Sequence, residues 1–450
     1  MKQASLTKTR LLAATALGLM SVFGMAQSAH ASGFGLREGA ADWLGNAFVG
    51  GEAKAYGADT AWTNPAGMAL LDQYEFSGNV SYVAPKATFS GTNTNPLTGA
   101  PVSGVTGNNA VAPAATGALF AVMPLSPDWR LGFSVTNPYG ERTSYPRNWV
   151  GRYQSLVSSI TAIDFSPSVS YKVNDQFSVG GGPVFEYFHA RLTQAINTPF
   201  SAATSQDPLA DVHGSNVGVG YNIGALYQID SATRVGLDYH SRIRHNISGT
   251  QKISIPAIYY ALTQSPNPYI AGGASQAIQM LSAQNSSART AVTLPDSIGA
   301  SIYHQVTPAL AVMASIQWTH WSLFNSLHIT PTNGMPGSTI EENWRNSWFG
   351  GVAANYQLTP KLMLQSGLAI DESPVTDSNR TSRVPDANHY DLGFGAKYQV
   401  TSNSTFEVAY AHVFAPSGTI ESSASTSAGT QTGRYDLSDN SITVGITTSF

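Results

Sequence analysis

The chain has 450 residues, a formal net charge of −4 and only 11% charged residues. Soluble domains usually carry about a quarter charged residues, so this composition is unusual for one. The net charge is mildly acidic, and the sequence contains no basic patch. Both observations argue against a nucleic-acid partner. The chain contains no cysteine, which excludes disulfides and thiolate metal or redox sites.

The first 31 residues have the pattern of a secretory signal peptide. Basic residues between positions 2 and 10 are followed by an apolar stretch over residues 11–26. Ala29-His30-Ala31 then gives the small-x-small pattern that a signal peptidase recognises. The apolar stretch is short for a membrane-spanning helix, so a membrane anchor is the less favoured alternative. We therefore expect residues 1–31 to be a signal peptide and the mature chain to begin at Ser32.

Beyond this segment, apolar and polar residues alternate with a period of two, and no long continuous apolar run occurs. Alternation without spanning helices is best explained by an all-β transmembrane antiparallel β-barrel, whose closed wall pairs every backbone polar group. A large soluble β-protein is the alternative. We expect about 14 strands within residues 74–450, an even number as in bacterial barrels, near 74–84, 114–123, 130–139, 160–172, 176–193, 214–228, 233–249, 289–305, 310–329, 346–357, 361–371, 389–400, 405–416 and 438–450.

The last predicted strand indicates the compartment. Ile442, Val444, Ile446 and Phe450 alternate with small polar residues, so one face suits lipid and the other an aqueous lumen. A terminal aromatic strand commonly serves as the assembly signal of outer-membrane barrels, so we expect Phe450 to be recognised by the barrel assembly machinery. The expected location is the outer membrane of a Gram-negative bacterium, surrounded by outer-membrane lipid. Aromatic residues expected in the interfacial girdles are Trp129, Trp318, Trp321, Tyr398 and Tyr410.

Residues 32–73 precede the first strand, are rich in Gly and Ala, and show no two-residue period. A barrel of this size has a lumen too wide for its own side chains to fill, so we expect this segment to plug it as an N-terminal hatch. Long polar loops are expected at 85–113, 194–213, 250–288, 372–388 and 417–437. Within the third loop, apolar residues at helical spacing either form a groove for a hydrophobic ligand or pack on neighbouring loops: Ile258, Tyr259, Leu262, Ile278, Met280 and Leu281.

An ordered series of short motifs runs along the chain: Gly33-Phe34, Asn64-Pro65-Ala66, Asn137 with Tyr139-Gly140, Leu294-Pro295-Asp296, Trp318 to Phe324, Asp371 to Val375, Asn379-Arg380, Pro385-Asp386 and Tyr410-Ala411-His412. Each motif alone is weak evidence, but the ordered set is specific. The series resembles the FadL-type long-chain fatty acid transporters of Gram-negative outer membranes. The resemblance covers nearly all of the mature chain and is weak in loops 85–113 and 417–437.

The resemblance implies a passive transporter that is not an enzyme and uses no cofactor. Ligand is expected to pass from a groove between outer loops to a lumen pocket, and then sideways through a wall gap beside a kinked third strand. Lateral exit suits a fatty acid, because each methylene gains about 0.8 kcal/mol on leaving water. The hatch is expected to gate this path. By resemblance, the gating residues are Asn64, Pro65 and Ala66 against the kink and Gly140 in it, and the ligand-binding residues include Phe34, Arg345 and, less cleanly, Arg191.

Other interpretations remain open from the sequence. The imperfect match at Arg191 leaves monoaromatic hydrocarbons as the alternative to long-chain fatty acids. A structural charge network of Asp371, Arg383 and Asp386 is favoured over a ligand site there. An outer-membrane lipid hydrolase is less favoured because no G-x-S-x-G motif occurs, and a general porin is weaker because a hatch would block ion flow. A metal site is not expected, since His240 and His245 should fall on opposite faces of one strand.

Overall fold

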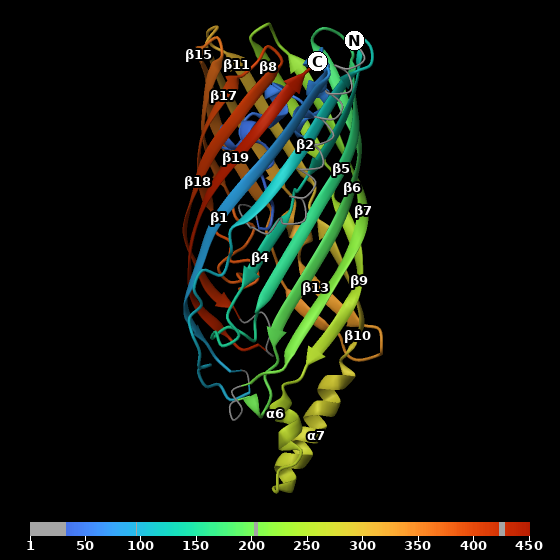
Figure 1. Ribbon diagram of the computed structural model, residues 1–450, viewed down its shortest axis with the longest axis vertical. Coiled ribbons are helices and arrows are strands. Elements are labelled where there is room, and N and C mark those ends of the chain that lie inside the picture. The colour runs from blue at the N-terminus through green and yellow to red at the C-terminus, as the bar shows by residue number, and fades with distance from the viewer. Residues whose placement is uncertain (1–32, 96, 202–205, 423–427) are drawn as a thin grey trace, which may run out of the picture.

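The computed structural model describes residues 33–95, 97–201, 206–422 and 428–450, so the predicted signal peptide lies outside the described residues. One antiparallel sheet closes on itself, because β1 (Glu75–Asn93) pairs with both β2 (Ala114–Pro124) and β19 (Gln431–Ser449). Figure 1 shows the resulting barrel with tilted strands. The remaining strands are β3 (Trp129–Thr136), β4 (Gly140–Ser144), β5 (Val157–Lys172), β6 (Phe177–Ala195), β7 (Leu209–Gln228), β8 (Thr233–His240), β9 (Ile243–Ser254), β10 (Ser286–Leu294), β11 (Ser297–Gln305), β12 (Leu310–Thr319), β13 (Ser326–Pro331), β14 (Ser338–Glu341), β15 (Ser347–Thr359), β16 (Leu362–Asp371), β17 (His389–Gln399) and β18 (Ser404–Ser422).

The wall is crossed by 14 strands, as the alternation predicts. Three crossing strands are each broken in two, as β3–β4, β8–β9 and β10–β11, while β13 and β14 form a hairpin between β12 and β15. The predicted loops at 85–113 and 417–437 are too long, because β1, β18 and β19 continue well into them. The outward faces of these strand ends are polar, and the apolar residues, such as Phe89, Ile420 and Tyr435, face inward. The pattern of apolar-out and polar-in residues that marks the lipid-facing part of a strand is therefore lost there.

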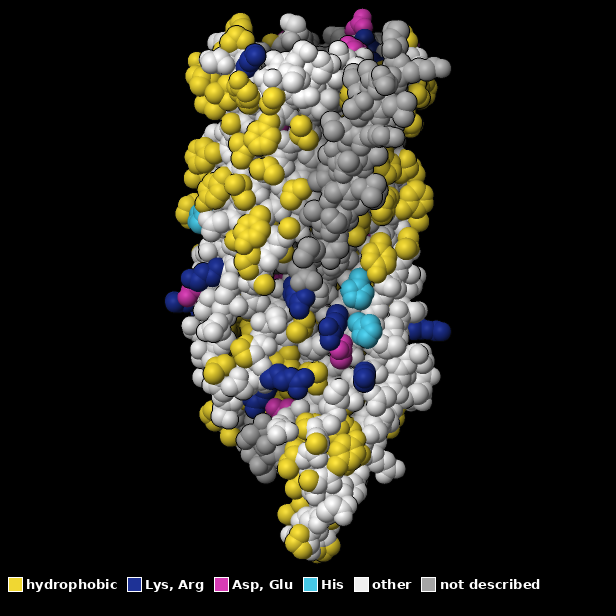
Figure 2. All heavy atoms as spheres, in the orientation of Figure 1, with side chains coloured by type: hydrophobic (Ala, Val, Ile, Leu, Met, Phe, Trp, Pro, Cys, Tyr) yellow, Lys and Arg dark blue, Asp and Glu magenta, His cyan; other side chains and the backbone are white. Residues whose placement is uncertain are grey.

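The outer face of the barrel carries an apolar band. On β7, for example, Val217, Val219, Tyr221 and Ile223 face outward and are about half exposed or more. In Figure 2, hydrophobic side chains gather over the half of this face nearer Phe450, and most charged side chains lie toward α6 (Ala257–Leu262) and α7 (Pro268–Ala283). Among the described residues, no helix is both long and apolar enough to cross a membrane. The strands are therefore the elements that present apolar surface to lipid.

Residues 33–73 lie inside the barrel, where Figure 1 shows them as the blue segment. They form only short helices, α2 (Ala41–Leu44), α3 (Gly51–Lys54), α4 (Thr60–Thr63) and the 3-10 helix η2 (Pro65–Leu70). Backbone approaches the wall closely at glycines: a β carbon on Gly236 would lie 1.9 Å from the Glu52 carbonyl oxygen, and one on Gly367 would lie 2.0 Å from that of Asn46. Small residues on both sides therefore let the segment fill the lumen.

Buried ion pairs fasten the inner segment near the barrel end that carries Phe450. Asp42 forms an ion pair with Lys54 at 2.6 Å and another with Lys397 of β17 at 2.6 Å. All three side chains are largely buried. Since each charge has an opposite partner, the cluster fixes α2 and α3 against the wall without leaving an isolated ion.

Candidate functional site

Phe34 is the centre of an aromatic cluster inside the barrel. Its ring is fully buried and lies edge-on to Trp321 and Phe324, with centroids 4.9 and 5.5 Å away. The rings of Trp344 and Tyr139 complete the cluster at 5.4 and 5.9 Å. Trp321 is therefore an interior residue and not a girdle residue, which corrects that prediction; the connection after β12 turns inward as a 3-10 helix, η3 (Trp321–Leu323), and takes the ring with it.

An apolar cavity of about 70 Å³ lies on the α6–α7 side of this cluster, and we call it the outer cavity. It is smaller than the cavity of about 150 Å³ that holds a benzene molecule in an engineered protein core. A ligand must therefore displace part of its lining. The lining consists mainly of hydrophobic side chains: Phe34, Ile160, Phe188, Ala190, Leu192, Val212, Ile247, Val292, Phe324, Leu327, Ile329 and Val384.

Three charged side chains also line the outer cavity: Arg383 and Glu342, which are buried, and Arg289, which is exposed. Arg383 is 7% exposed; its Nη2 donates to Oε1 of Gln194 at 2.6 Å, while its Nη1 has no hydrogen-bond acceptor among the described residues. Burial lowers the pKa of Arg383 to about 10, and the negative charge of Glu342 opposes this shift. Burial raises the pKa of Glu342 to about 7, and the charge of Arg383 and a hydrogen bond from Trp344 oppose this shift. The cavity thus holds a buried cation that retains a free donor.

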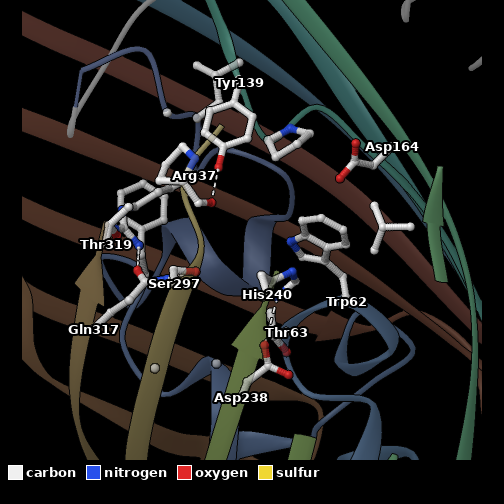
Figure 3. A pocket seen from close by; sticks show the side chains of 18 of the residues that line it. Arg37, Trp62, Thr63, Tyr139, Asp164, Asp238, His240, Ser297, Gln317 and Thr319 are labelled. Carbon is white, nitrogen blue, oxygen red and sulfur yellow. Dashed lines mark hydrogen bonds and ion pairs between the residues drawn. The ribbon is translucent and has the colours of Figure 1, made fainter. Parts of the chain in front are cut away.

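A second space of about 200 Å³, the inner chamber, lies on the other side of the Phe34 cluster. It lies between the inner segment and the wall, as Figure 3 shows. Arg37 donates to Gln317 at 2.6 Å on one side of the chamber, and His240 pairs with Asp238 at 2.9 Å on another. Tyr139 and Trp321 line the inner chamber and also contact Phe34. The ring of Phe34 therefore belongs to the partition between the two spaces.

The third crossing strand is broken at residues 137–139, between β3 and β4. The inner segment pairs with this break: Gly35 lies opposite Tyr139, the Leu36 N–H donates to the Pro138 carbonyl at 2.8 Å, and the Gly140 N–H donates to the Phe34 carbonyl at 2.9 Å. Gly140 thus lies at the kink, as the sequence predicts. A β carbon on it would come within 2.8 Å of Cδ1 of Leu36, so glycine permits this contact.

Asn64, Pro65 and Ala66 lie elsewhere, which corrects the expectation that they face the kink. The Asn64 side chain donates to the Ala225 carbonyl of β7 at 3.0 Å, and the Ala66 carbonyl accepts from Ser178 of β6 at 2.9 Å. Asn64 also caps η2 by accepting from the Ala66 N–H. The motif anchors the inner segment on β5 to β7, because its polar groups satisfy backbone there while residues 34–36 reach the kink.

The two predicted ligand-binding arginines lie outside both spaces. Arg191 is on the outward face of β6 and pairs with Asp211 at 2.6 Å, with about half of its side chain exposed. Arg345 is exposed, and its Nε donates to the Ser373 carbonyl at 3.2 Å. Both predictions are therefore corrected, since neither cation lines the cavity. The buried cation of the cavity is Arg383, which the sequence placed in a charge network with Asp371 and Asp386.

That predicted network is divided in the structure. Asp371 pairs with Arg37 of the inner segment at 3.2 Å. Asp386 accepts from the Gly33 N–H at 2.9 Å and pairs with His389 at 3.2 Å. These acids tie residues 33–37 to the wall, so they take no part in balancing Arg383.

The apolar residues predicted to form a groove lie on α6 and α7, which confirms the helical spacing. Tyr259 is fully buried: its hydroxyl is 2.6 Å from that of Thr198, and its ring packs edge-on to Phe200. Leu281 is also buried, while Ile258, Leu262 and Ile278 are half-buried. Tyr259 and Leu281 therefore pack the hairpin and offer no surface to a ligand, which corrects their assignment. Other apolar side chains of the hairpin are exposed: Tyr260, Tyr269, Ile270 and Met280.

His240 and His245 both face the interior, contrary to the expectation from a continuous strand. The break at residues 241–242 changes which residues face inward, from even positions in β8 to odd positions in β9. His245 is fully buried, with Nε2 2.7 Å from Oε1 of Glu186. Within the described ranges, no group of three or more His, Asp or Glu side chains is arranged to hold a metal ion.

The chain is similar in sequence and in structure to known outer-membrane proteins. A long-chain fatty acid transport protein of Salmonella typhi is 25% identical over 421 residues, which cover 90% of this chain and 91% of the relative. The solved structure of a Pseudomonas aeruginosa FadL homologue matches with a TM-score of 0.84 and 24% identity, over 93% of this chain and 100% of the homologue. The Ralstonia pickettii toluene transporter TbuX matches with a TM-score of 0.64 and 16% identity, over 94% and 99% of the two chains.

The structural matches show the same fold: a closed barrel with similar strand arrangement. A family model described as outer membrane protein transport protein (OMPP1/FadL/TodX) matches residues 22–450, which is nearly the whole chain. The family consists of outer-membrane transporters of hydrophobic compounds. The chain therefore belongs to the FadL/TodX family and is a multi-pass β-barrel of the Gram-negative outer membrane.

Proposed function

We propose that this protein takes up long-chain fatty acids by passive transport, with residues 33–73 acting as a hatch. The ligand reaches the outer cavity from the extracellular loops, displaces the Phe34 cluster, and leaves sideways at the break between β3 and β4. Phe450 is half exposed at the end of the wall, where the barrel assembly machinery has access to it. The protein has no catalytic role in this proposal.

The observation that carries the proposal is the pairing of an apolar cavity with the buried Arg383. A fatty acid has two parts, a hydrocarbon chain that suits the apolar lining and a carboxylate that suits the guanidinium. The Nη1 of Arg383 lacks an acceptor among the described residues, and a ligand carboxylate would supply one. Gln194 and Glu342 already balance part of this buried charge, and a ligand carboxylate at Nη1 would satisfy the remaining donor.

The curated relatives named for long-chain fatty acid transport agree with this ligand. Structural neighbours named for toluene and monoaromatic hydrocarbons give the alternative, an uncharged aromatic ligand taken by the same route. The cavity lining alone does not distinguish these ligands, since hydrocarbon chains and aromatic rings are both apolar. The carboxylate is the distinguishing group.

The test compares oleate with oleyl alcohol, which has the same chain without the charge. Purified protein is titrated with each ligand, and so are the variant Arg383→Gln and the control Arg191→Gln, whose arginine is exposed on the outer face of β6. Loss of one charge-assisted contact should weaken oleate binding by about tenfold or more. The alcohol should bind the Arg383→Gln variant as it binds the wild type, and Arg191→Gln should change neither affinity.

Uptake completes the test in a Gram-negative strain that lacks its own fatty acid transporter. Labelled oleate should enter cells that express the protein above an empty-vector control. Toluene uptake without oleate uptake would keep the barrel and replace the ligand by the alternative. Equal oleate affinity in the wild type and Arg383→Gln would contradict the assigned carboxylate site.

A further inference from the structure

The barrel wall contains a second interruption, between β7 and the broken strand β8–β9. The ladder between β7 and β9 ends at the pair Ser215 and Ser248. Pairing of β7 resumes with β8 at Asn222 and His240. The intervening residues 216–221 and 241–247 are all described. They form no ladder with each other, apart from hydrogen bonds between Tyr221 and Ser241. We call this stretch of wall the seam.

Side chains fill the seam in place of backbone hydrogen bonds. Gly218 and Gly220 of β7 face it, and a β carbon on either would lie within 2.6 Å of a carbon of Ile243. His245 also reaches this position, 2.7 Å from the β carbon that Gly218 lacks. Ile243 and His245 are buried, and Asn216 lies 3.2 Å from Nδ1 of His245. Gly218 and Gly220 have no side chains, so they leave room that two side chains of β9 occupy.

The seam adjoins both interior spaces, and the outer surface beside it is apolar. Ile247 lines the outer cavity, whereas Ile243 and Ser241 line the inner chamber. Tyr221 also lines the inner chamber, although its side chain is on the outward face of β7 and 48% exposed. The chamber therefore reaches the β7 edge of the seam. Val219 makes the neighbouring outer surface apolar.

Along the sheet, strands β5 and β6 separate the seam from the kink. The Ala162 N–H donates to the Tyr139 carbonyl at the kink, and the sheet register continues from Ala162 to Phe188 and from Phe188 to Asn216. The kink and the seam differ in what covers the interrupted pairing. Residues 34–36 cover the kink through backbone pairing, whereas side chains alone close the seam. Side chains change rotamer without any movement of the inner segment.

We propose that the seam is a second lateral opening, through which a hydrophobic ligand passes from the lumen into the outer leaflet of the membrane. This inference rests on the proposed uptake function. Ile243 and His245 are the closing side chains, and their displacement joins the inner chamber to lipid next to Val219 and Tyr221. The driving force is the same as at the kink, since apolar surface leaves water for hydrocarbon.

Two reversible disulfide locks separate the two routes, and the absence of native cysteine prevents mispairing. The kink lock is Gly35→Cys with Tyr139→Cys. These residues form an antiparallel pair flanked by, and not sharing, backbone hydrogen bonds; in such pairs the Cα atoms lie about 4.5 Å apart, within the range for a disulfide. The seam lock is Gly220→Cys with Ile243→Cys, because a γ carbon of Ile243 lies 2.6 Å from the position of a β carbon at Gly220.

Initial uptake of labelled oleate is measured for each lock and for both together, with the same cells treated with reductant as the matched control. The kink lock should lose part of the uptake, and both locks together should lose all of it, with recovery on reduction. Complete loss with the kink lock alone would overturn the inference and leave the proposed function standing. Residual uptake that is equal with one and with both locks would also overturn it. No uptake by the reduced proteins would refute the proposed function instead.

A single substitution tests the same inference if the seam lock fails to form. Ile243→Ala shortens the closing side chain and should raise oleate uptake in the oxidised kink-locked protein. The control Ile302→Ala removes the same atoms from an outward-facing residue of the intact pairing between β11 and β12. An Ile243→Ala variant whose uptake equals that of the control would overturn the second opening.

Discussion

The partition formed by Phe34 predicts the behaviour of the variant Phe34→Ala. Its ring is fully buried among four other aromatic rings with centroids 4.9 to 5.9 Å away. Truncation of a buried phenylalanine costs about 3–5 kcal/mol. That loss falls on the closed arrangement, because the ring holds residues 34–36 between the two spaces. At about 1.4 kcal/mol per factor of ten, the ratio of open to closed hatch should rise by about 10² to 4 × 10³.

The assay is ion conductance across planar bilayers that contain the purified protein. The wild type should pass little steady current if residues 33–73 fill the lumen, and Phe34→Ala should show frequent openings. Phe34→Leu keeps most of the apolar volume and should lie between the two. Oleate affinity should also fall in Phe34→Ala, because the ring lines the outer cavity.

The matched control is Phe89→Ala. Phe89 is equally buried but packs on Trp149 and Tyr435 under the outer loops, away from the inner segment. It should lose similar stability without altering conductance. A correctly inserted Phe34→Ala barrel that is as closed as the Phe89→Ala barrel would refute the role of the aromatic cluster as the partition.

Three further outcomes follow from the same geometry. Burial raises the pKa of Glu342 to about 7, so this carboxyl is neutral below that pH and negative above it. Oleate affinity should therefore fall as the pH rises through about 7, while oleyl alcohol affinity should stay constant. Glu342→Gln should remove this pH dependence in a binding titration. Asp42→Asn leaves Lys54 without its carboxylate partner and Lys397 with Glu407 at 3.5 Å, so it should loosen the inner segment by about 3–5 kcal/mol, measured as increased conductance. Asp175→Asn at an exposed ion pair should have no effect. Gly140→Arg should assemble normally but lower oleate uptake, because the arginine side chain would fill the gap through which the ligand leaves. Gly272→Arg in α7, which has open space around it, is the control.

The barrel was predictable because lipid imposes a strict rule on a strand. Outward residues such as Val217 and Val219 must be apolar where they meet hydrocarbon, so the alternation is strong there and weak in the polar strand ends of β1 and β18. The helices α6 and α7 were predictable for a similar reason, since their apolar residues recur at helical spacing. Periodicity therefore locates elements wherever one face has a single kind of neighbour.

The site was less predictable, because it depends on irregular backbone. Residues 241–242 change which side chains face inward, and no residue at that point is a proline or glycine that would mark a break. Arg383 lies in a long loop with other charged residues, so only the fold shows that this arginine enters the cavity and Arg345 does not. Sequence spacing carries no information about which of several loop cations turns inward.

The pairing of residues 34–36 with the kink couples ligand binding to opening of the wall. The Leu36 and Gly140 N–H groups donate to carbonyls across this pairing, so the inner segment supplies hydrogen bonds that the broken strand lacks. Two such bonds contribute about 2 kcal/mol to the closed state, in addition to the packing of Phe34. Phe34 directly precedes the paired residue Gly35, so a ligand that pushes its ring out of the outer cavity also pulls on these bonds. On our proposal the fatty acid therefore opens its own exit by occupying its site, and no external energy source is required.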